Sequence, residues 1–265
     1  MIEGRPTARH IQPWMRRELE FIACSNYVRE KLEEAGLQVI DVIHHGLVRE
    51  QVEVARRLVP TARENLRRLH GDKVIFGAVA FWHRRKGLEL LAKACEMLSS
   101  KRDDFVVHLV TNVTAKRKLP PVKGLYVDTV FGTRSREEIL AFLGAIDFLI
   151  VPSLAEGFCL PLVEANAMGT PAIHALYPPL TEVTTPEANI TFQYELVAFE
   201  SLGEGIDYEL HIYSPAALAQ AMEEAIEMIL NDKEEYERRC REARKALDRF
   251  DAEKLYPRLL KYIGG

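Results

Sequence analysis

The chain has 265 residues, 48% of them hydrophobic and 28% charged, which is the composition of an ordinary folded protein that can bury a sizeable core. The formal net charge of −4 at pH 7 gives no overall positive field that would favour a nucleic acid as partner. No apolar run reaches the roughly 18 residues of a membrane-spanning helix. The four cysteines lie far apart in sequence, so they predict neither a zinc site nor a disulfide framework, and a reducing cytoplasm is the expected location.

Residues 2–5 read I-E-G-R. These letters also form a protease site used in expression vectors, so they are kept out of the argument about the fold, whether or not they are native. Short apolar runs further along the chain predict strands at 21–25, 39–43, 74–80, 105–111, 125–131 and 148–153. Amphipathic stretches between most of them predict helices at 26–35, 87–99, 135–145 and 161–168. This alternation predicts an α/β protein with a Rossmann-like parallel sheet.

Two helix starts carry clear capping signals. Ser135 followed by Glu138 has the spacing of a capping box, and Ser214 precedes Pro215 as an N-cap before an N1 proline. Residues 49–70 predict two short helices split at Pro60. From Pro215 onward the pattern predicts helix, with breaks near 231–232, 251 and 257. The stretch 189–205 is read as a hairpin or a lid insertion.

These elements suggest four parts. Residues 1–48 form a partial second Rossmann-like unit, 49–72 a helical linker, 73–230 the complete Rossmann-like domain, and 231–265 the C-terminal helices. The first part is too small for a core of its own. We therefore expect it to be the end of a domain whose beginning is absent. Its open edge should expose Phe21, Ile22 and Val42 unless something covers them.

Several well-known motifs are missing from the sequence. There is no G-x-G-x-x-G, so a dinucleotide oxidoreductase is not favoured, and no G-x-x-x-x-G-K-[ST] of a P-loop enzyme. H-E-x-x-H and G-x-S-x-G are absent too, as is a D-x-D pair that could clamp a diphosphate through a metal.

One segment carries candidate chemistry. A predicted buried strand at 148–153 runs into Glu156-Gly157-Phe158, and a helix with Glu164 follows. Ligands in open α/β sheets bind at the carboxyl ends of strands, and amides near a helix N-terminus favour phosphate. Carboxylates accept hydrogen bonds from vicinal hydroxyls, so two glutamates around a phosphate cradle suit a nucleotide sugar. Each glutamate also has a simple structural explanation, as a loop carboxylate or a complement to the helix dipole.

The string E-G-F-x-L-P-x-x-E-A-x-A-x-G-x-P resembles the E-x7-E motif of the family 4 glycosyltransferases, which have the two-domain GT-B fold. Further segments resemble that family in the same order: 21–30 its last acceptor-domain strand and helix, 42–46 its hinge strand, 85–91 its Lys-Gly helix start, and 133–140 its "S-x-E-E-L" helix. The resemblance covers residues 21–262, mainly the family's C-terminal donor-binding domain.

The resemblance implies specific roles. Glu156 would contact the donor sugar and Lys86 the donor diphosphate, as the catalytic pair. Glu164 would hold the nucleotide ribose, and the amides of Gly157 and Phe158 the phosphates. The implied reaction is transfer from a nucleoside diphosphate sugar with retention, without a metal or a bound cofactor.

The sequence also departs from the family. Phe81 stands where the family's phosphate-binding arginine is usual, and Arg85 or Arg84 could substitute for it. Cys159 replaces a usual glycine, which a cysteine tolerates if the backbone there is not left-handed. We expect its thiol to be buried and inert. His174 is expected to be structural, and Glu182 to cap a helix.

Other readings stay open. The chief alternative is a non-catalytic nucleotide-sugar-binding module, or a subunit completed by a separate acceptor-domain protein. A homo-oligomer is the other expected form of association, and the acceptor is unknown. A GT-B epimerase is a further alternative, which the Glu156/Glu164 spacing disfavours.

Overall fold

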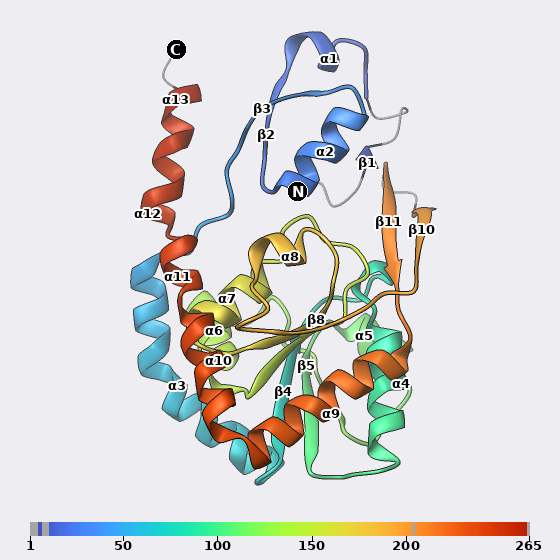
Figure 1. Ribbon diagram of the computed structural model, residues 1–265, viewed down its shortest axis with the longest axis vertical. Helices are drawn as coiled ribbons and strands as arrows, with labels where there is room; N and C mark the ends of the chain where they lie inside the picture. The colour runs from blue at the N-terminus through green and yellow to red at the C-terminus, as the bar shows by residue number, and fades with distance from the viewer. Residues whose placement is uncertain (1–4, 7–10, 203–204, 264–265) are drawn as a thin grey trace.

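The computed structural model describes residues 5–6, 11–202 and 205–263, so residues 2–4 of the I-E-G-R string lie outside the described part. Its centre is a six-stranded parallel sheet with the strand order β6-β5-β4-β7-β8-β9 (Figure 1). The strands are β4 (Val74–Val79), β5 (Phe105–Val110), β6 (Leu125–Asp128), β7 (Phe148–Val151), β8 (Ala172–Ala175) and β9 (Ile190–Phe192). A parallel sheet is covered on both faces, which explains why these strands are nearly continuous apolar runs. The predicted α/β class is confirmed.

Helices cover both faces of this sheet (Figure 1). The helices α4 and α9 pack together on one face, and α3, α6 and α7 lie on the other, with α10 against α7. Their bounds are α3 (Arg49–His70), α4 (Leu88–Ser99), α5 (Val113–Lys118), α6 (Arg136–Ala145), α7 (Leu160–Met168), α8 (Leu180–Val183), α9 (Pro215–Asn231) and α10 (Lys233–Arg244). Both predicted caps are present: the Ser135–Glu138 capping box on α6 and Ser214 before Pro215 on α9.

The order of the strands reverses between β4 and β7. The chain leaves β4 toward β5 and β6 on one side, then returns through α6 to β7 and continues to β8 and β9 on the other side. Such a switch point leaves a crevice outside the carboxyl ends of the two central strands. The loops after β4 and β7 therefore face each other.

A smaller unit lies above the large domain in Figure 1. It consists of α1 (Met15–Glu18), β2 (Glu20–Ala23), α2 (Asn26–Glu34) and β3 (Gln38–Val42), and its two strands are parallel. Its buried hydrophobic residues form a cluster separate from the main core. Phe21, Ile22 and Val42 are half-buried rather than exposed, because Phe21 and Val42 pack against this cluster. The expected edge is thus covered only in part, by packing within the smaller unit.

The stretch after β9 forms a hairpin, which confirms that alternative. β10 (Leu196–Ser201) pairs antiparallel with β11 (Ile206–Ile212), and β1 (Arg5–Pro6) pairs with the other edge of β11. The preceding residues at 190–192 belong to the main sheet as β9. The hairpin extends from the large domain toward the smaller unit (Figure 1).

The prediction of two helices split at Pro60 was wrong, because α3 is one continuous helix with Pro60 inside it. The proline costs the helix a backbone hydrogen bond. Tertiary contacts along the whole helix offset that cost. Val52 and Leu66, on either side of Pro60, are buried in the main core, and Arg56 Nη2 donates to Ala167 O at 2.9 Å.

The C-terminal helices return to the smaller unit (Figure 1). They continue through α11 (Ala246–Arg249), α12 (Ala252–Leu255), the 3-10 turn η2 (Tyr256–Leu259) and α13 (Leu260–Ile263). The breaks predicted near 231–232 and 251 are present, but Pro257 lies within η2, and the break between α10 and α11 was not predicted. Arg258 Nη2 lies 2.6 Å from Asp41 Oδ1 on β3.

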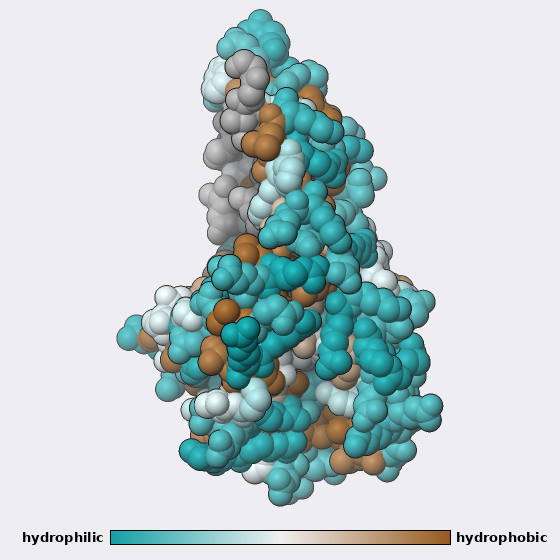
Figure 2. All heavy atoms as spheres, turned by 90° about the vertical axis from the view of Figure 1, so that its left-hand side faces the viewer, coloured by the Kyte–Doolittle hydropathy of each residue, from teal (hydrophilic) through white to brown (hydrophobic). Residues whose placement is uncertain are grey.

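Figure 2 faces α3 and these C-terminal helices and shows a mostly hydrophilic surface with a narrower upper part. No helix in the described part of the chain combines the length and apolar character needed to cross a membrane.

Candidate functional site

Two loops meet at the switch point of the sheet. The loop after β4 contains a short 3-10 turn, Arg84–Lys86, and the loop after β7 contains Glu156. Lys86 Nζ lies 2.6 Å from Glu156 Oε1, and Arg85 Nη1 lies 3.5 Å from Glu156 Oε2. Glu156 is only 3% exposed. A buried carboxylate with two cationic partners is a fixed charge cluster, and it stands where a parallel sheet binds its ligand.

The structure distinguishes between Arg84 and Arg85, the two residues that could replace the family's phosphate-binding arginine. Arg85 is buried, donates to Ala155 O at 3.3 Å, and lies near Glu156. Its guanidinium lies 5.7 Å from the centre of the Phe81 ring and 6.0 Å from that of Tyr208 on β11. Phe81, at the usual arginine position, thus helps to hold Arg85 in place.

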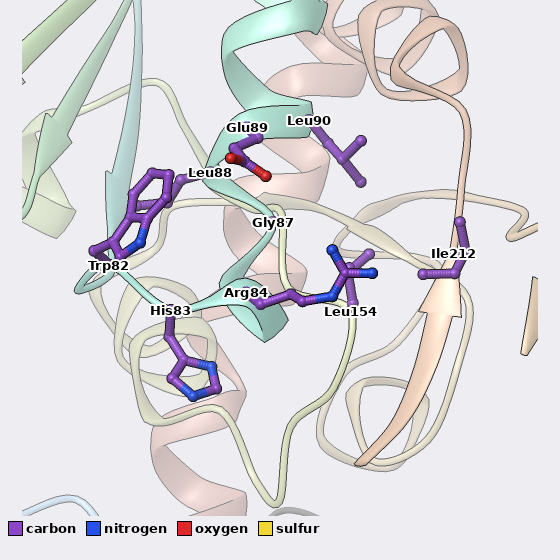
Figure 3. Close-up of a pocket in the computed structure, with 9 residues that line it drawn as sticks. All are labelled: Trp82, His83, Arg84, Gly87, Leu88, Glu89, Leu90, Leu154 and Ile212. Carbon is purple, nitrogen blue, oxygen red and sulfur yellow. The ribbon is translucent and has the colours of Figure 1, made fainter. Parts of the chain in front are cut away.

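Arg84, in contrast, turns away from Glu156. Its Nε and Nη2 both lie 2.5 Å from the carboxylate of Glu200 on β10. Figure 3 shows its side chain extending toward Ile212 across a cavity of about 170 Å³. This cavity is lined by Trp82, His83, Arg84, Gly87, Leu88, Glu89, Leu90, Leu154 and Ile212, and Arg84 is the one candidate site residue among them.

The loop after β7 is fixed by buried side chains that the sequence analysis did not identify. Tyr213 Oη donates to Pro152 O at 2.6 Å, and Tyr177 Oη donates to Ser153 O at 2.8 Å. The backbone N–H of Leu154 donates to Arg85 O at 2.7 Å, which ties this loop to the loop after β4. Both tyrosines are fully buried, so the path of the chain to Glu156 is set before any ligand binds.

Gly87 allows the close approach of these two loops. It has φ 62°, and a Cβ at this position would lie 1.9 Å from Pro152 O. Any other residue would push the loops apart. Gly87 also precedes α4, so Lys86 lies directly at the start of that helix.

Gly157 and Phe158 lie where the phosphate cradle was predicted. Neither backbone N–H makes a hydrogen bond to any residue that the structure describes. Gly157 O accepts from Ser25 Oγ at 2.7 Å, and in a trans peptide the N–H of Phe158 points the opposite way. The Phe158 side chain is fully buried, 5.0 Å from the His45 ring and 5.7 Å from the Phe250 ring. It anchors the loop, and Gly157 and Phe158 are both buried in this structure.

Cys159 corrects one expectation. A cysteine is expected at this position only outside the left-handed region, yet the φ and ψ of Cys159 are both 70°. The usual glycine of the family is therefore explained by backbone geometry, and Cys159 adopts that geometry at a cost in strain. Its thiol is buried, and burial raises its pKa well above the usual range. The expectation of an unreactive thiol agrees with this environment.

Glu164 lies in α7 and is 2% exposed. Arg136, the first residue of α6, pairs with its Oε1. Burial raises the pKa of Glu164, and the Arg136 guanidinium opposes that effect. The charges of Glu156, Lys86 and Glu164 all act on the Cys159 thiol, which lies between the two motif glutamates in the sequence. The sequence-predicted residues are thus gathered around one short segment of chain.

Other candidates have structural roles. His174 is fully buried and contacts Ala175 O at 2.9 Å and Thr184 Oγ1 at 3.1 Å, as expected of a structural histidine. Glu182 accepts from the backbone N–H of Asn26 at 2.9 Å, so it does cap a helix, namely α2 of the smaller unit. Within the ranges that the structure describes, no three His, Cys, Asp or Glu side chains are grouped to hold a metal.

The chain matches the family model described as Glycosyl transferases group 1 over residues 72–232. It is 30% identical over 263 residues to "Uncharacterized glycosyltransferase 335" of Sulfolobus islandicus rod-shaped virus 1, covering 98% of this chain and 77% of that protein. A shorter match, 37% over 107 residues, is to the MMP alpha-(1->4)-mannosyltransferase of Mycolicibacterium hassiacum, covering 38% of this chain and 26% of that protein.

Solved structures match most of this chain. A glycosyltransferase from Rickettsia africae superposes with a TM-score of 0.74 and 15% identity, covering 95% of this chain and 66% of that one. Sucrose-phosphate synthase from Thermosynechococcus elongatus gives 0.67 and 21%, covering 92% and 57%. Anabaena HepE in complex with UDP-glucose gives 0.68 and 18%, covering 91% and 62%. This chain thus spans less than two thirds of each of these three structures. From the family match and the viral relative, the chain belongs to the Glycosyl transferases group 1 family, and its fold is that of the GT-B glycosyltransferases.

Proposed function

We propose that this glycosyltransferase moves a sugar from a nucleoside diphosphate sugar to an acceptor hydroxyl with retention of the anomeric configuration. The observation that carries the proposal is the ion pair between the partly buried Lys86 and the buried Glu156 at the switch point, beside the N-terminus of α7. Glu156 accepts hydrogen bonds from the donor sugar, and Glu164 accepts them from the ribose. HepE binds UDP-glucose, so that compound is the first donor to test.

The diphosphate is held by positive charge from several directions. Lys86 has three N–H donors, so it can contact a phosphate while keeping its contact with Glu156. Arg85 supplies a second cation, and the N–H groups of Gly157 and Phe158 add neutral donors. No side chain caps α7, so its positive end also faces the phosphates. In this proposal these groups carry out the charge neutralisation without a metal.

The reaction then needs no general base from this domain. The bond between the sugar C1 and the diphosphate oxygen breaks, and the acceptor oxygen bonds to C1 on the same face. The acceptor proton passes to the departing diphosphate oxygen, so a glycoside and a nucleoside diphosphate are formed. Negative charge grows on the leaving diphosphate, and Lys86, Arg85 and the two amides stabilise it.

Calorimetry on point variants tests these roles. Glu164→Ala should weaken binding of both the free nucleoside diphosphate and the nucleotide sugar, because charge-assisted hydrogen bonds worth about 1.5–3 kcal/mol are lost. Glu156→Ala should weaken only the sugar-bearing ligand. Lys86→Ala should weaken diphosphates far more than the bare nucleoside. Glu224→Ala and Lys93→Ala remove exposed charges on α9 and α4, and both should leave binding unchanged.

Glutamine variants at 156 and 164, checked by thermal melting, separate lost contacts from lost folding. Equal losses of both ligands in both glutamate variants would contradict the assignment of roles. Product release measured with radiolabelled donor addresses the chemistry. Tight donor binding without transfer to any acceptor would favour the alternative, a nucleotide-sugar-binding module.

A further inference from the structure

Glu164 has an unusual environment for a charged side chain. Its carboxylate is 3% exposed, and Arg136 is the only cation within ion-pair distance of it among the described residues. Arg136 occupies Oε1, whereas no described residue donates a hydrogen bond to Oε2. A buried carboxylate normally fills its lone-pair positions with donors. Glu164 therefore keeps acceptor capacity for hydroxyls that come from outside the protein.

Arg136 is also in an unusual position. It is the first residue of α6, whose start is fixed by the reciprocal hydrogen bonds of Ser135 and Glu138. A positive side chain is unfavourable at a helix N-terminus, where the helix dipole is itself positive. The Arg136 side chain is 40% exposed and could extend into water, yet it turns to the buried Glu164. The stability of α6 does not explain why Arg136 contacts Glu164. The proposed nucleotide site, which contains Glu164, offers an explanation.

The charge state of Glu164 decides what it can bind. A carboxylate accepts from two vicinal hydroxyls at once, whereas a protonated acid must donate one proton and accepts less well. Burial favours the protonated form, and the neighbouring cation opposes it. The Cys159 thiol also interacts electrostatically with Glu164, and burial keeps this thiol neutral. No charged side chain of α3, α10, α11, β7 or β8 lies within ion-pair distance of Glu164 in the described residues.

We propose that Arg136 is a positioning residue of the nucleotide site, which holds Glu164 as an oriented carboxylate for both hydroxyls of a ribose. The proposal rests on the proposed function, in which Glu164 is the ribose ligand. It commits the site to ribonucleotides. A 2′-deoxy nucleotide offers one hydroxyl fewer, so the site discriminates against it.

The test is calorimetry of wild type, Arg136→Met and Arg136→Lys with ADP, CDP, GDP and UDP and with their 2′-deoxy counterparts, between pH 6 and pH 8.5. For the best-bound ribonucleotide, we expect wild-type affinity to change little with pH. Arg136→Met should bind it about tenfold more weakly at pH 6, since the loss of one charge-assisted contact is worth about 1.4 kcal/mol. Affinity should recover as the pH rises, because Glu164 with a raised pKa is protonated at low pH and ionises at high pH.

Two further readouts separate positioning from a general structural role. Arg136→Lys should restore most of the affinity and the flat pH profile, and Arg136→Met should lose the preference for ribose over deoxyribose. Arg134→Met is the matched control, because Arg134 is equally exposed, lies two residues away and pairs with Asp128 instead. It should bind like wild type, and thermal melting checks that each variant is folded.

The outcomes are distinguishable. If Glu164→Ala binds ribonucleotides normally, or if wild type binds none of the four, the proposed function itself fails. If Glu164→Ala binds poorly but Arg136→Met keeps normal affinity with a flat pH profile, only the role of Arg136 fails. Tighter binding by Arg136→Met would overturn the inference as well, because Arg136 would then obstruct the site.

Discussion

At the scale of single residues, Cys159 combines a chemical and a conformational constraint. It is the only residue other than glycine with positive φ among those that the structure describes. The left-handed conformation costs a residue with a Cβ about 1 kcal/mol. At an ordinary helical position alanine is more stable than glycine by about 0.5–1 kcal/mol. At position 159 the order should be reversed.

We therefore expect Cys159→Gly to be more stable than Cys159→Ala by about 1 kcal/mol, as measured by urea unfolding. Ala167→Gly, in the buried interior of the adjacent α7, is the matched control and should lose about 1 kcal/mol. Both variants at 159 should bind nucleotide as wild type does, because the thiol has no assigned contact with the ligand. A Cys159→Ala variant that is the more stable of the pair would show that the strain is unimportant.

Whether a residue of the candidate site could be predicted depends on how far away in sequence its partners lie. Glu156 and Glu164 could be proposed from the local E-x7-E motif, and Lys86 from a second local segment at 85–91. Tyr213 and Arg136 could not, because their partners are far away in sequence: Tyr213 reaches Pro152, and Arg136 reaches Glu164. Only the packing of α6 beside α7 and of the hairpin beside the loop after β7 makes those contacts.

At the scale of elements, the segment after β11 controls the loop that carries Glu156. Tyr213 follows β11, and its hydroxyl donates to Pro152 O at the end of β7. Tyr213→Phe keeps the ring and removes the donor, leaving a buried carbonyl unpaired at a cost of about 1–2 kcal/mol. Because that carbonyl belongs to the loop of Glu156, we expect weaker binding of a nucleotide sugar, with little change for the free nucleoside.

Tyr236→Phe is a matched control for this prediction. Tyr236 lies on α10, and its hydroxyl donates to Asp147 O at 3.1 Å, on the opposite end of β7 from the site. The same chemical change should cost similar stability there and leave sugar binding intact. Calorimetry beside urea unfolding compares the two variants, and equal binding losses would mean that the effect of Tyr213 is only one of stability.

The elements themselves were largely predictable. Strands β4 to β7 and the helices α4, α6 and α7 follow from hydrophobic period and capping residues, which are local signals, whereas β9 lies in the stretch 189–205 that the sequence left between a hairpin and a lid. The continuity of α3 through Pro60 was not predictable, because local propensity favours a break there and burial of Val52 and Leu66 in one core overrides it. The sequence predicts the hairpin only as one of two alternatives, because an edge ribbon of mixed polarity has no strong period.

At the scale of the whole molecule, the smaller unit is held to the site itself. Ser25 Oγ donates to Gly157 O, in the segment proposed to bind phosphate, and Glu182 of the large domain caps α2 and contacts His44 Nε2 at 2.7 Å. These contacts couple the position of the smaller unit to the proposed nucleotide site. The unit's own sheet has only two strands in the described residues, and a two-stranded sheet is weakly stable by itself.

We expect the chain to associate, with itself or with a separate protein that binds the acceptor, through the outer edge of β2. An unpaired strand edge with the half-buried Phe21 and Ile22 is a template for another strand. Light scattering at micromolar concentration should show assembly, and Ile22→Lys should abolish it, whereas Leu230→Lys on exposed α9 should not. Transfer requires an acceptor hydroxyl held against the donor, so we also expect that the unassociated chain binds nucleotide but transfers sugar slowly. A monodisperse monomer with rapid transfer would contradict both expectations, since the smaller unit would then suffice to orient the acceptor.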